Sequence, residues 1–95
     1  MNPTLQCEET KKLLNQGAFL VDVRSVEEFQ AGALKGAINL PLQVIPTAHN
    51  LMKEDAEIIV YCGTGQRSMQ AATLLKQVGF DKVHNLGSYQ NIQYC

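Results

Sequence analysis

Short apolar runs alternate with amphipathic segments along this chain. A run of roughly four to eight apolar residues bounded by glycine or polar residues is typical of a buried strand. Longer segments, in which apolar positions recur three or four residues apart, indicate helices that cover a core. The pattern predicts strands at residues 18–23, 36–40, 57–61 and 82–86. It predicts helices at residues 8–15, 25–32, 42–52 and 67–78.

Turn-forming and capping residues mark the ends of these elements. Gly17 and Gly79 follow predicted helices, where glycine commonly ends a helix. Ser25, with Glu28 three residues later, fits a capping box at the start of a short helix that ends near residue 32. Pro46 lies inside the predicted helix at 42–52, so it must start, kink or break that helix.

The alternation of strands and helices predicts the fold class. We expect one α/β domain over residues 1–95, with a mainly parallel central sheet of about four to five short strands and helices on both faces. In such sheets the functional site lies beyond the carboxyl ends of the strands. Asp22 and Arg24 lie at one strand end and Cys62 at another, so these residues are expected to share one edge of the sheet.

Composition excludes several other kinds of protein. The 95 residues are 45% hydrophobic and 18% charged, with a formal net charge of −1, which gives no reason to expect binding to nucleic acid or to a membrane. No apolar run approaches the roughly 20 residues that cross a bilayer. Residues 1–6 lack the basic and apolar segments of a signal peptide, so we expect a cytoplasmic protein. His49 and His84 are far apart and do not have the spacing of zinc ligands.

Cys62 is the strongest candidate for chemistry. It follows the predicted strand at 57–61 and opens a glycine-rich loop that leads into the next helix, namely Gly63, Thr64, Gly65, Gln66, Arg67 and Ser68. Such a loop directs several backbone N–H groups and the positive end of a helix dipole at one point. This setting favours a thiolate over a thiol and attracts an anion beside it. Outside this context, a single cysteine at a strand end would be interpreted as a small buried apolar residue.

The charged residues near this loop have more than one interpretation. Arg67 either caps the loop by bonding to its carbonyl groups or holds an anionic substrate. One interpretation of Asp22 and Arg24 is a surface ion pair of little energetic value. The other is that Asp22, which follows three apolar residues, meets the edge of the core and needs partners there. Glu28 has a capping role, which explains its presence without any further function.

Taken together, these residues resemble the single-domain rhodaneses, which are sulfurtransferases. The resemblance covers nearly the whole chain in the order of the family. It includes residues 21–24 after the first strand, residues 36–41 (similar to GA-x-N-[IL]-P) and residues 59–68 (similar to [IV]-V-x-C-x-x-G-x-R-[SA]). The chain departs from the family at Ala33, where many members have histidine, and at Gly63, where some have arginine or lysine. Gly87 and Ser88 replace the usual double glycine.

The resemblance implies an activity and assigns roles. Cys62 would take a sulfane sulfur from a small anionic donor such as thiosulfate, become a persulfide, and pass the sulfur to cyanide or a thiol. Backbone N–H groups of residues 63–67 would hold the outer sulfur, Arg67 would add a formal charge, and Asp22 and Arg24 would support the site. No metal or organic cofactor is needed. The absence of a second cation at Gly63 predicts that free thiosulfate is a mediocre donor.

Two alternative functions remain at this stage. Cysteine phosphatases and arsenate reductases also place cysteine and arginine around an anion-binding loop, but with five residues between them. Here four residues separate Cys62 from Arg67, and this tighter loop favours a single sulfur atom. A persulfide carrier or sensing module whose acceptor is a protein thiol is the second alternative, because the fold and the loop do not define the partner.

Overall fold

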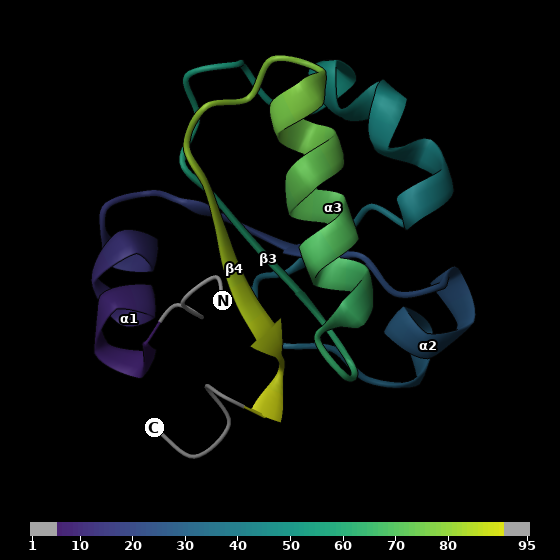
Figure 1. Ribbon diagram of the computed structural model, residues 1–95. Helices are drawn as coiled ribbons and strands as arrows, with labels where there is room; N and C mark the ends of the chain where they lie inside the picture. Colours follow the sequence, from purple (N-terminus) through teal and green to yellow (C-terminus); the bar gives the residue numbers. More distant parts are fainter. Residues whose placement is uncertain (1–5, 91–95) are drawn as a thin grey trace.

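A parallel sheet forms the centre of the protein in the computed structural model, which describes residues 6–90 (Figure 1). Its four strands, in the order β2-β1-β3-β4, are β1 (Phe19–Asp22), β2 (Ile38–Asn39), β3 (Ile58–Cys62) and β4 (Val83–Ser88). All three neighbouring pairs run parallel. The predicted α/β class and the parallel sheet are therefore confirmed.

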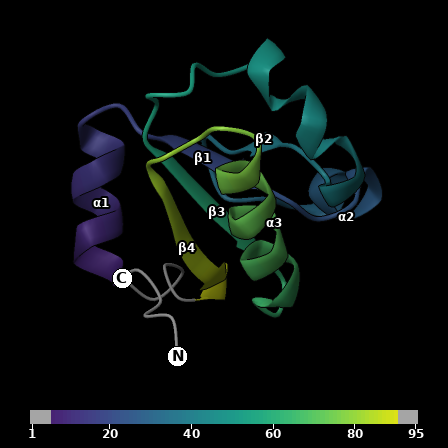
Figure 2. The ribbon, with the colours of Figure 1, turned by 45° about the horizontal axis from the view of Figure 1, so that its top comes forward.

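Helices cover both faces of this sheet (Figures 1 and 2). On one face lies α1 (Cys7–Asn15), and on the other lie α3 (Gln66–Gln77) and the 3₁₀ helix η1 (Leu42–Asn50). The short helix α2 (Val26–Ala31) connects β1 to the strand β2. Within residues 6–90 no helix combines the length and the apolar character needed to cross a membrane.

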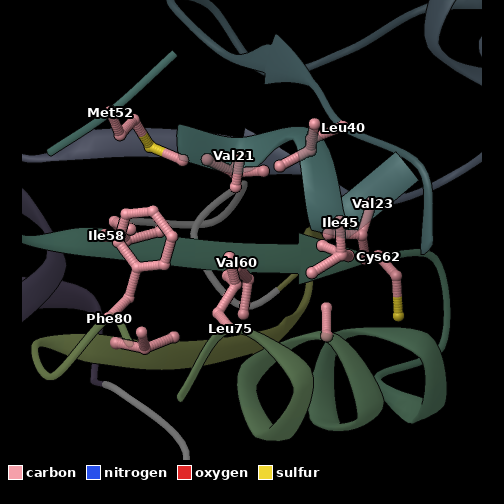
Figure 3. Packing of buried hydrophobic residues seen from close by; sticks show 13 residues of the cluster. Val21, Val23, Leu40, Ile45, Met52, Ile58, Val60, Cys62, Leu75 and Phe80 are labelled. Atoms are coloured by element: carbon pink, nitrogen blue, oxygen red, sulfur yellow. The ribbon is translucent and has the colours of Figure 1, made fainter. Parts of the chain in front are cut away.

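The core consists of two layers separated by β3. All five residues of β3 are fully buried, as expected for the continuous apolar run of a central parallel strand. Because successive side chains of a strand point to opposite faces, Ile58, Val60 and Cys62 belong to the larger layer under α3, as Figure 3 shows. Ile59 and Tyr61 belong to the smaller layer, which packs against α1.

Local sequence signals correctly predicted most element ends. The capping box of α2 is present, since Ser25 Oγ accepts from the Glu28 amide at 3.2 Å and the Ser25 amide donates to Glu28 Oε1 at 3.1 Å. Of the segment predicted to be a helix at 42–52, residues Leu42–Asn50 form the 3₁₀ helix η1, with Pro46 inside it. Proline has no N–H to donate to a carbonyl four residues earlier, which disfavours the α-helical form there.

Candidate active site

The carboxyl ends of β1 and β3 bring the predicted residues together at one edge of the sheet. Asp22 is the last residue of β1 and lies opposite Tyr61 in the register of the two strands. Cys62 is the next residue along and ends β3. The loop of residues 63–65 then leads directly into α3, so the thiol lies at the N-terminus of that helix. Both strand ends and the loop thus face a common edge.

The sulfur of Cys62 takes the place of a helix cap. Its Sγ accepts hydrogen bonds from the Gly65 amide at 2.8 Å and from the Ser68 amide at 3.4 Å. Burial by itself raises the pKa of the Cys62 thiol, but hydrogen bonds from the Ser68 side chain and from nearby backbone amides hold that pKa below its ordinary value. Figure 3 shows the sulfur directed toward the end of α3 nearest the loop. The site therefore favours a thiolate without a histidine base.

Cys62 is also fully buried and belongs to the hydrophobic core, and its thiol is free. The interpretation of Cys62 as a small buried residue is therefore correct for its packing. Its hydrogen bonds set it apart from an ordinary core cysteine, because a buried apolar environment alone would raise its pKa. The structure thus combines a core position with donors that stabilise the charged form.

The end of β4 fixes the shape of the loop. Ser88 Oγ donates to the Gly63 carbonyl at 2.9 Å, and the Tyr89 amide donates to the Cys62 carbonyl at 3.0 Å. A register shift between β3 and β4 precedes these contacts, and such a shift changes the direction of the residues after it. Gly65 has φ +98°, whereas Gly63 is not among the glycines with positive φ. Of the two loop glycines, Gly65 is thus the one whose backbone conformation requires glycine.

Arg67 pairs with a residue that the sequence reasoning left outside the site. Its Nη1 and Nη2 donate to the two carboxylate oxygens of Glu28 at 2.6 and 3.1 Å. Hydrogen bonds from the Arg67 side chain and the Ser25 amide lower the pKa of Glu28 to about 2, so the carboxylate stays ionised at neutral pH. The interpretation that capping explains the whole role of Glu28 is wrong. The sequence signal for the pairing with Arg67 was the position of Glu28 in the first helical turn after β1, on the edge of the sheet that it shares with Cys62.

Asp22 and Arg24 form a buried ion pair and not a surface one. Asp22 is fully buried, and its carboxylate accepts from Arg24 Nε at 3.0 Å and from Nη2 at 2.7 Å. The same Nη2 donates to the Gly32 carbonyl at 2.6 Å. The guanidinium carbon lies 5.6 Å from the centre of the Tyr89 ring. Arg24 therefore connects β1 to the segment after α2 and to the residue that follows β4.

A pocket of about 470 Å³ opens beside these pairs. Its lining residues come from the end of β1, from α2 and the segment after it, and from the residue after β4: Arg24, Glu28, Ala31, Gly32, Ala33, Leu34 and Tyr89. Glu28 links the pocket to the cysteine loop, because the carboxylate that lines the pocket also binds Arg67. Sequence reasoning did not identify this pocket, since its walls are brought together only by the fold.

Comparison with known proteins identifies the family. The chain matches the Rhodanese-like domain family over residues 6–95 and therefore belongs to that family. It is 35% identical over 71 residues to the Allochromatium vinosum protein named sulfurtransferase. The aligned segment covers 75% of this chain and 66% of that protein, so the match spans just under two thirds of the relative's length. It is 35% identical over 104 residues to the human thiosulfate:glutathione sulfurtransferase, with 93% of this chain and 90% of that protein covered.

The solved structure of the human single-domain sulfurtransferase TSTD1 has the same fold. It superposes with a TM-score of 0.84 at 30% identity, covering 99% of this chain and 97% of that chain. The resemblance seen in the sequence to a single-domain rhodanese is confirmed. The family and the names of these relatives support sulfur transfer as the general activity. Among the described residues, no cluster of three or more histidine, cysteine and acidic side chains could hold a metal ion.

Proposed function

We propose that this protein is a sulfurtransferase in which Cys62 carries a sulfane sulfur as a persulfide. The observation that carries the proposal is the position of Sγ, which accepts from the Gly65 and Ser68 amides at the start of α3. These donors favour the thiolate, and the thiolate is the nucleophilic form of cysteine. They are already oriented toward the sulfur, so little rearrangement is needed when charge develops there.

In the first half-reaction the Cys62 thiolate attacks the sulfane sulfur of a donor such as thiosulfate. A sulfur–sulfur bond forms to Cys62, the donor's sulfur–sulfur bond breaks, and sulfite leaves with the electron pair. The outer sulfur of the persulfide then carries the negative charge. Backbone N–H groups of residues 63–67 stabilise that charge, together with the positive end of the α3 dipole.

In the second half-reaction cyanide or a thiolate attacks the outer sulfur. Thiocyanate or a new persulfide leaves, and the Cys62 thiolate is restored. Because Cys62 is fully buried, both half-reactions require the loop to move enough to expose the sulfur. Sulfur resides on the protein between the two steps, so the kinetics should follow a double-displacement pattern.

Intact mass measurement tests this proposal. The reduced protein is incubated with thiosulfate in one sample and with glutathione persulfide in another, and either donor is expected to add one sulfur atom, about 32 Da. The Cys62→Ser variant keeps Cys7 and Cys95 and is the matched control; it should show no adduct. An unchanged mass with both donors, or an adduct that persists in Cys62→Ser, would contradict the role of Cys62.

The same samples separate the two alternative functions. Hydrolysis of p-nitrophenyl phosphate without a sulfur adduct would favour the phosphatase. An adduct that transfers slowly to cyanide and rapidly to a protein thiol would favour a persulfide carrier. Rapid transfer to cyanide and to small thiols supports the sulfurtransferase as proposed.

A further inference from the structure

The end of β4 lies directly against the cysteine loop. In the register of the two strands, Ser88 is the partner of Cys62, the last residue of β3. A Cβ on Gly65 would lie 3.7 Å from Gly87 Cα and 3.8 Å from the Ser88 nitrogen, so the turn of the loop packs on the backbone of β4. Contacts made by the last residues of β4 therefore influence the conformation of the loop.

Two carbonyl groups of the loop are held by this strand end. The Tyr89 amide donates to the Cys62 carbonyl at 3.0 Å, and Ser88 Oγ donates to the Gly63 carbonyl at 2.9 Å. Within residues 6–90 no peptide bond is cis, and in a trans peptide group the C=O and N–H bonds point in opposite directions. A carbonyl bound on the β4 side thus turns the amide of the following residue away from β4. The two bonds therefore fix the directions of the Gly63 and Thr64 N–H groups.

The Thr64 amide acts on the reactive sulfur. Burial raises the pKa of the Cys62 thiol, and hydrogen bonds from Ser68, Gly65 and Thr64 bring that pKa below its ordinary value. The Thr64 N–H is thus directed toward Sγ, on the side of its peptide group that faces away from β4. A hydrogen bond to the carbonyl end of a peptide group also polarises that group, which strengthens the N–H donor at its other end.

The hydroxyl of Ser88 has a defined direction. Its oxygen accepts from the Gln90 amide at 3.2 Å, while its proton is donated to the Gly63 carbonyl. A serine hydroxyl has a single proton, so the bond to Gly63 uses its whole capacity as a donor. The bond from Tyr89 to the loop comes from the main chain and does not depend on the side chain there. The bond to Gly63, in contrast, requires a hydroxyl at residue 88.

We propose that Ser88 is a positioning residue for sulfur transfer, whose hydroxyl orients the peptide group between Gly63 and Thr64 toward the sulfur of Cys62. This inference rests on the proposed role of Cys62. Ser88 takes no part in the bonds that form and break. It acts through the Thr64 N–H, which stabilises negative charge on the attacking Sγ and on the outer sulfur of the persulfide. Without the hydroxyl this peptide group is free to rotate, and its amide loses that direction.

The variant Ser88→Ala tests the inference with two measurements. The pH profile of iodoacetamide alkylation, followed at Cys62 by peptide mass, should move to higher pH, because the thiolate loses support from an amide. The Arg67 charge that acts on Cys62 is held by Glu28 and is present in both proteins, so it does not contribute to this difference.

The second measurement is the rate of sulfur addition from thiosulfate in single turnovers. The limiting rate constant should fall about tenfold, whereas the half-saturating thiosulfate concentration should stay within about twofold of the wild-type value. Removal of a whole oxyanion donor costs about 10²–10³-fold in rate, and a donor that is present but misdirected costs less.

Two further variants serve as controls. Ser88→Thr keeps a hydroxyl at this position and should restore both measurements to wild-type values. Thr47→Ala removes another bond from a hydroxyl to a carbonyl, the one that Thr47 Oγ1 donates to Val44 at 2.6 Å on η1. It should change neither measurement. Circular dichroism of each variant establishes that it is folded before the assays.

The outcomes separate this inference from the function on which it rests. An unshifted alkylation profile and an unchanged limiting rate constant in folded Ser88→Ala would overturn the inference. Equal losses in Ser88→Ala and Ser88→Thr would do the same, because they would assign the effect to the space at residue 88 and not to the hydroxyl. In both cases the adduct on Cys62 still forms and the proposed function stands. A wild-type protein that forms no adduct would overturn the proposed function, whereas the alkylation profile would still test the role of Ser88.

Discussion

Two glycines of the cysteine loop should respond in opposite directions to the same substitution. Gly65 has φ +98°, in the region that side chains other than glycine rarely adopt, whereas Gly63 does not. A Cβ on Gly65 would meet Gly87 Cα at 3.7 Å, which is an ordinary van der Waals contact. The expected penalty of Gly65→Ala is therefore backbone strain and not a steric clash. Gly63→Ala, two residues away, is the matched control.

The magnitude follows from the backbone angles. Left-handed backbone costs about 1–2 kcal/mol for a residue with a Cβ. Replacing glycine by alanine also restricts the unfolded chain, which stabilises the folded state by about 0.4–1 kcal/mol where the backbone is compatible. The second effect is common to both variants and cancels in their difference. Gly63→Ala should thus exceed Gly65→Ala in stability by about 1–2 kcal/mol, and each kcal/mol shifts Tm by about 4–8 °C in a domain of this size.

Thermal unfolding of the reduced proteins, followed by circular dichroism and repeated in urea, measures this difference. Gly63→Ala should melt at or slightly above the wild-type temperature, and Gly65→Ala below it. Equal melting temperatures for the two variants would refute the assignment of positive φ to Gly65 alone. A destabilised Gly63→Ala would show that a steric contact, and not the backbone angle, limits substitution in this loop.

Three further predictions concern the charged groups of the site. Ser68→Ala should raise the pKa of Cys62, because it removes the side-chain hydrogen bond that favours the thiolate. The pH profile of iodoacetamide alkylation should then shift to higher pH, and Ser68→Thr should restore the wild-type profile. An unshifted profile in Ser68→Ala would exclude this hydrogen bond. Asp22→Asn should lower the free energy of unfolding in urea by about 3 kcal/mol, because it leaves the Arg24 charge without its buried partner, and a loss below about 1 kcal/mol would indicate a solvated pair. The folded-state pKa of Glu28, about 2, lies below its ordinary value, so the contribution of its carboxylate to stability is complete above about pH 4.5 and is lost as the pH falls toward 2. The difference in free energy of unfolding between wild type and Glu28→Gln should therefore narrow over that range. A difference that stays constant with pH would contradict the ion pair.

The sequence by itself determined the features that depend on neighbours along the chain. The capping box of Ser25 and Glu28, the buried strand before Cys62 and the glycine-rich loop after it all act within a few residues. Local patterns of this kind indicate helix and strand positions because backbone hydrogen bonds in helices and turns are short-range. The order of strands and helices then predicted a parallel sheet, and the motifs in their order predicted the family.

The tertiary structure alone decided which charges meet. Glu28 and Arg67 are 39 residues apart, and they form an ion pair because α2 and α3 both begin at the carboxyl edge of neighbouring strands. The pocket has the same origin, since Tyr89 after β4 and Arg24 after β1 reach it from opposite sides of β3. No local pattern predicts such contacts, because they depend on strand order and on the register shift before Tyr89. The sequence therefore predicts a reactive cysteine, and the fold shows that the arginines beside it are already neutralised.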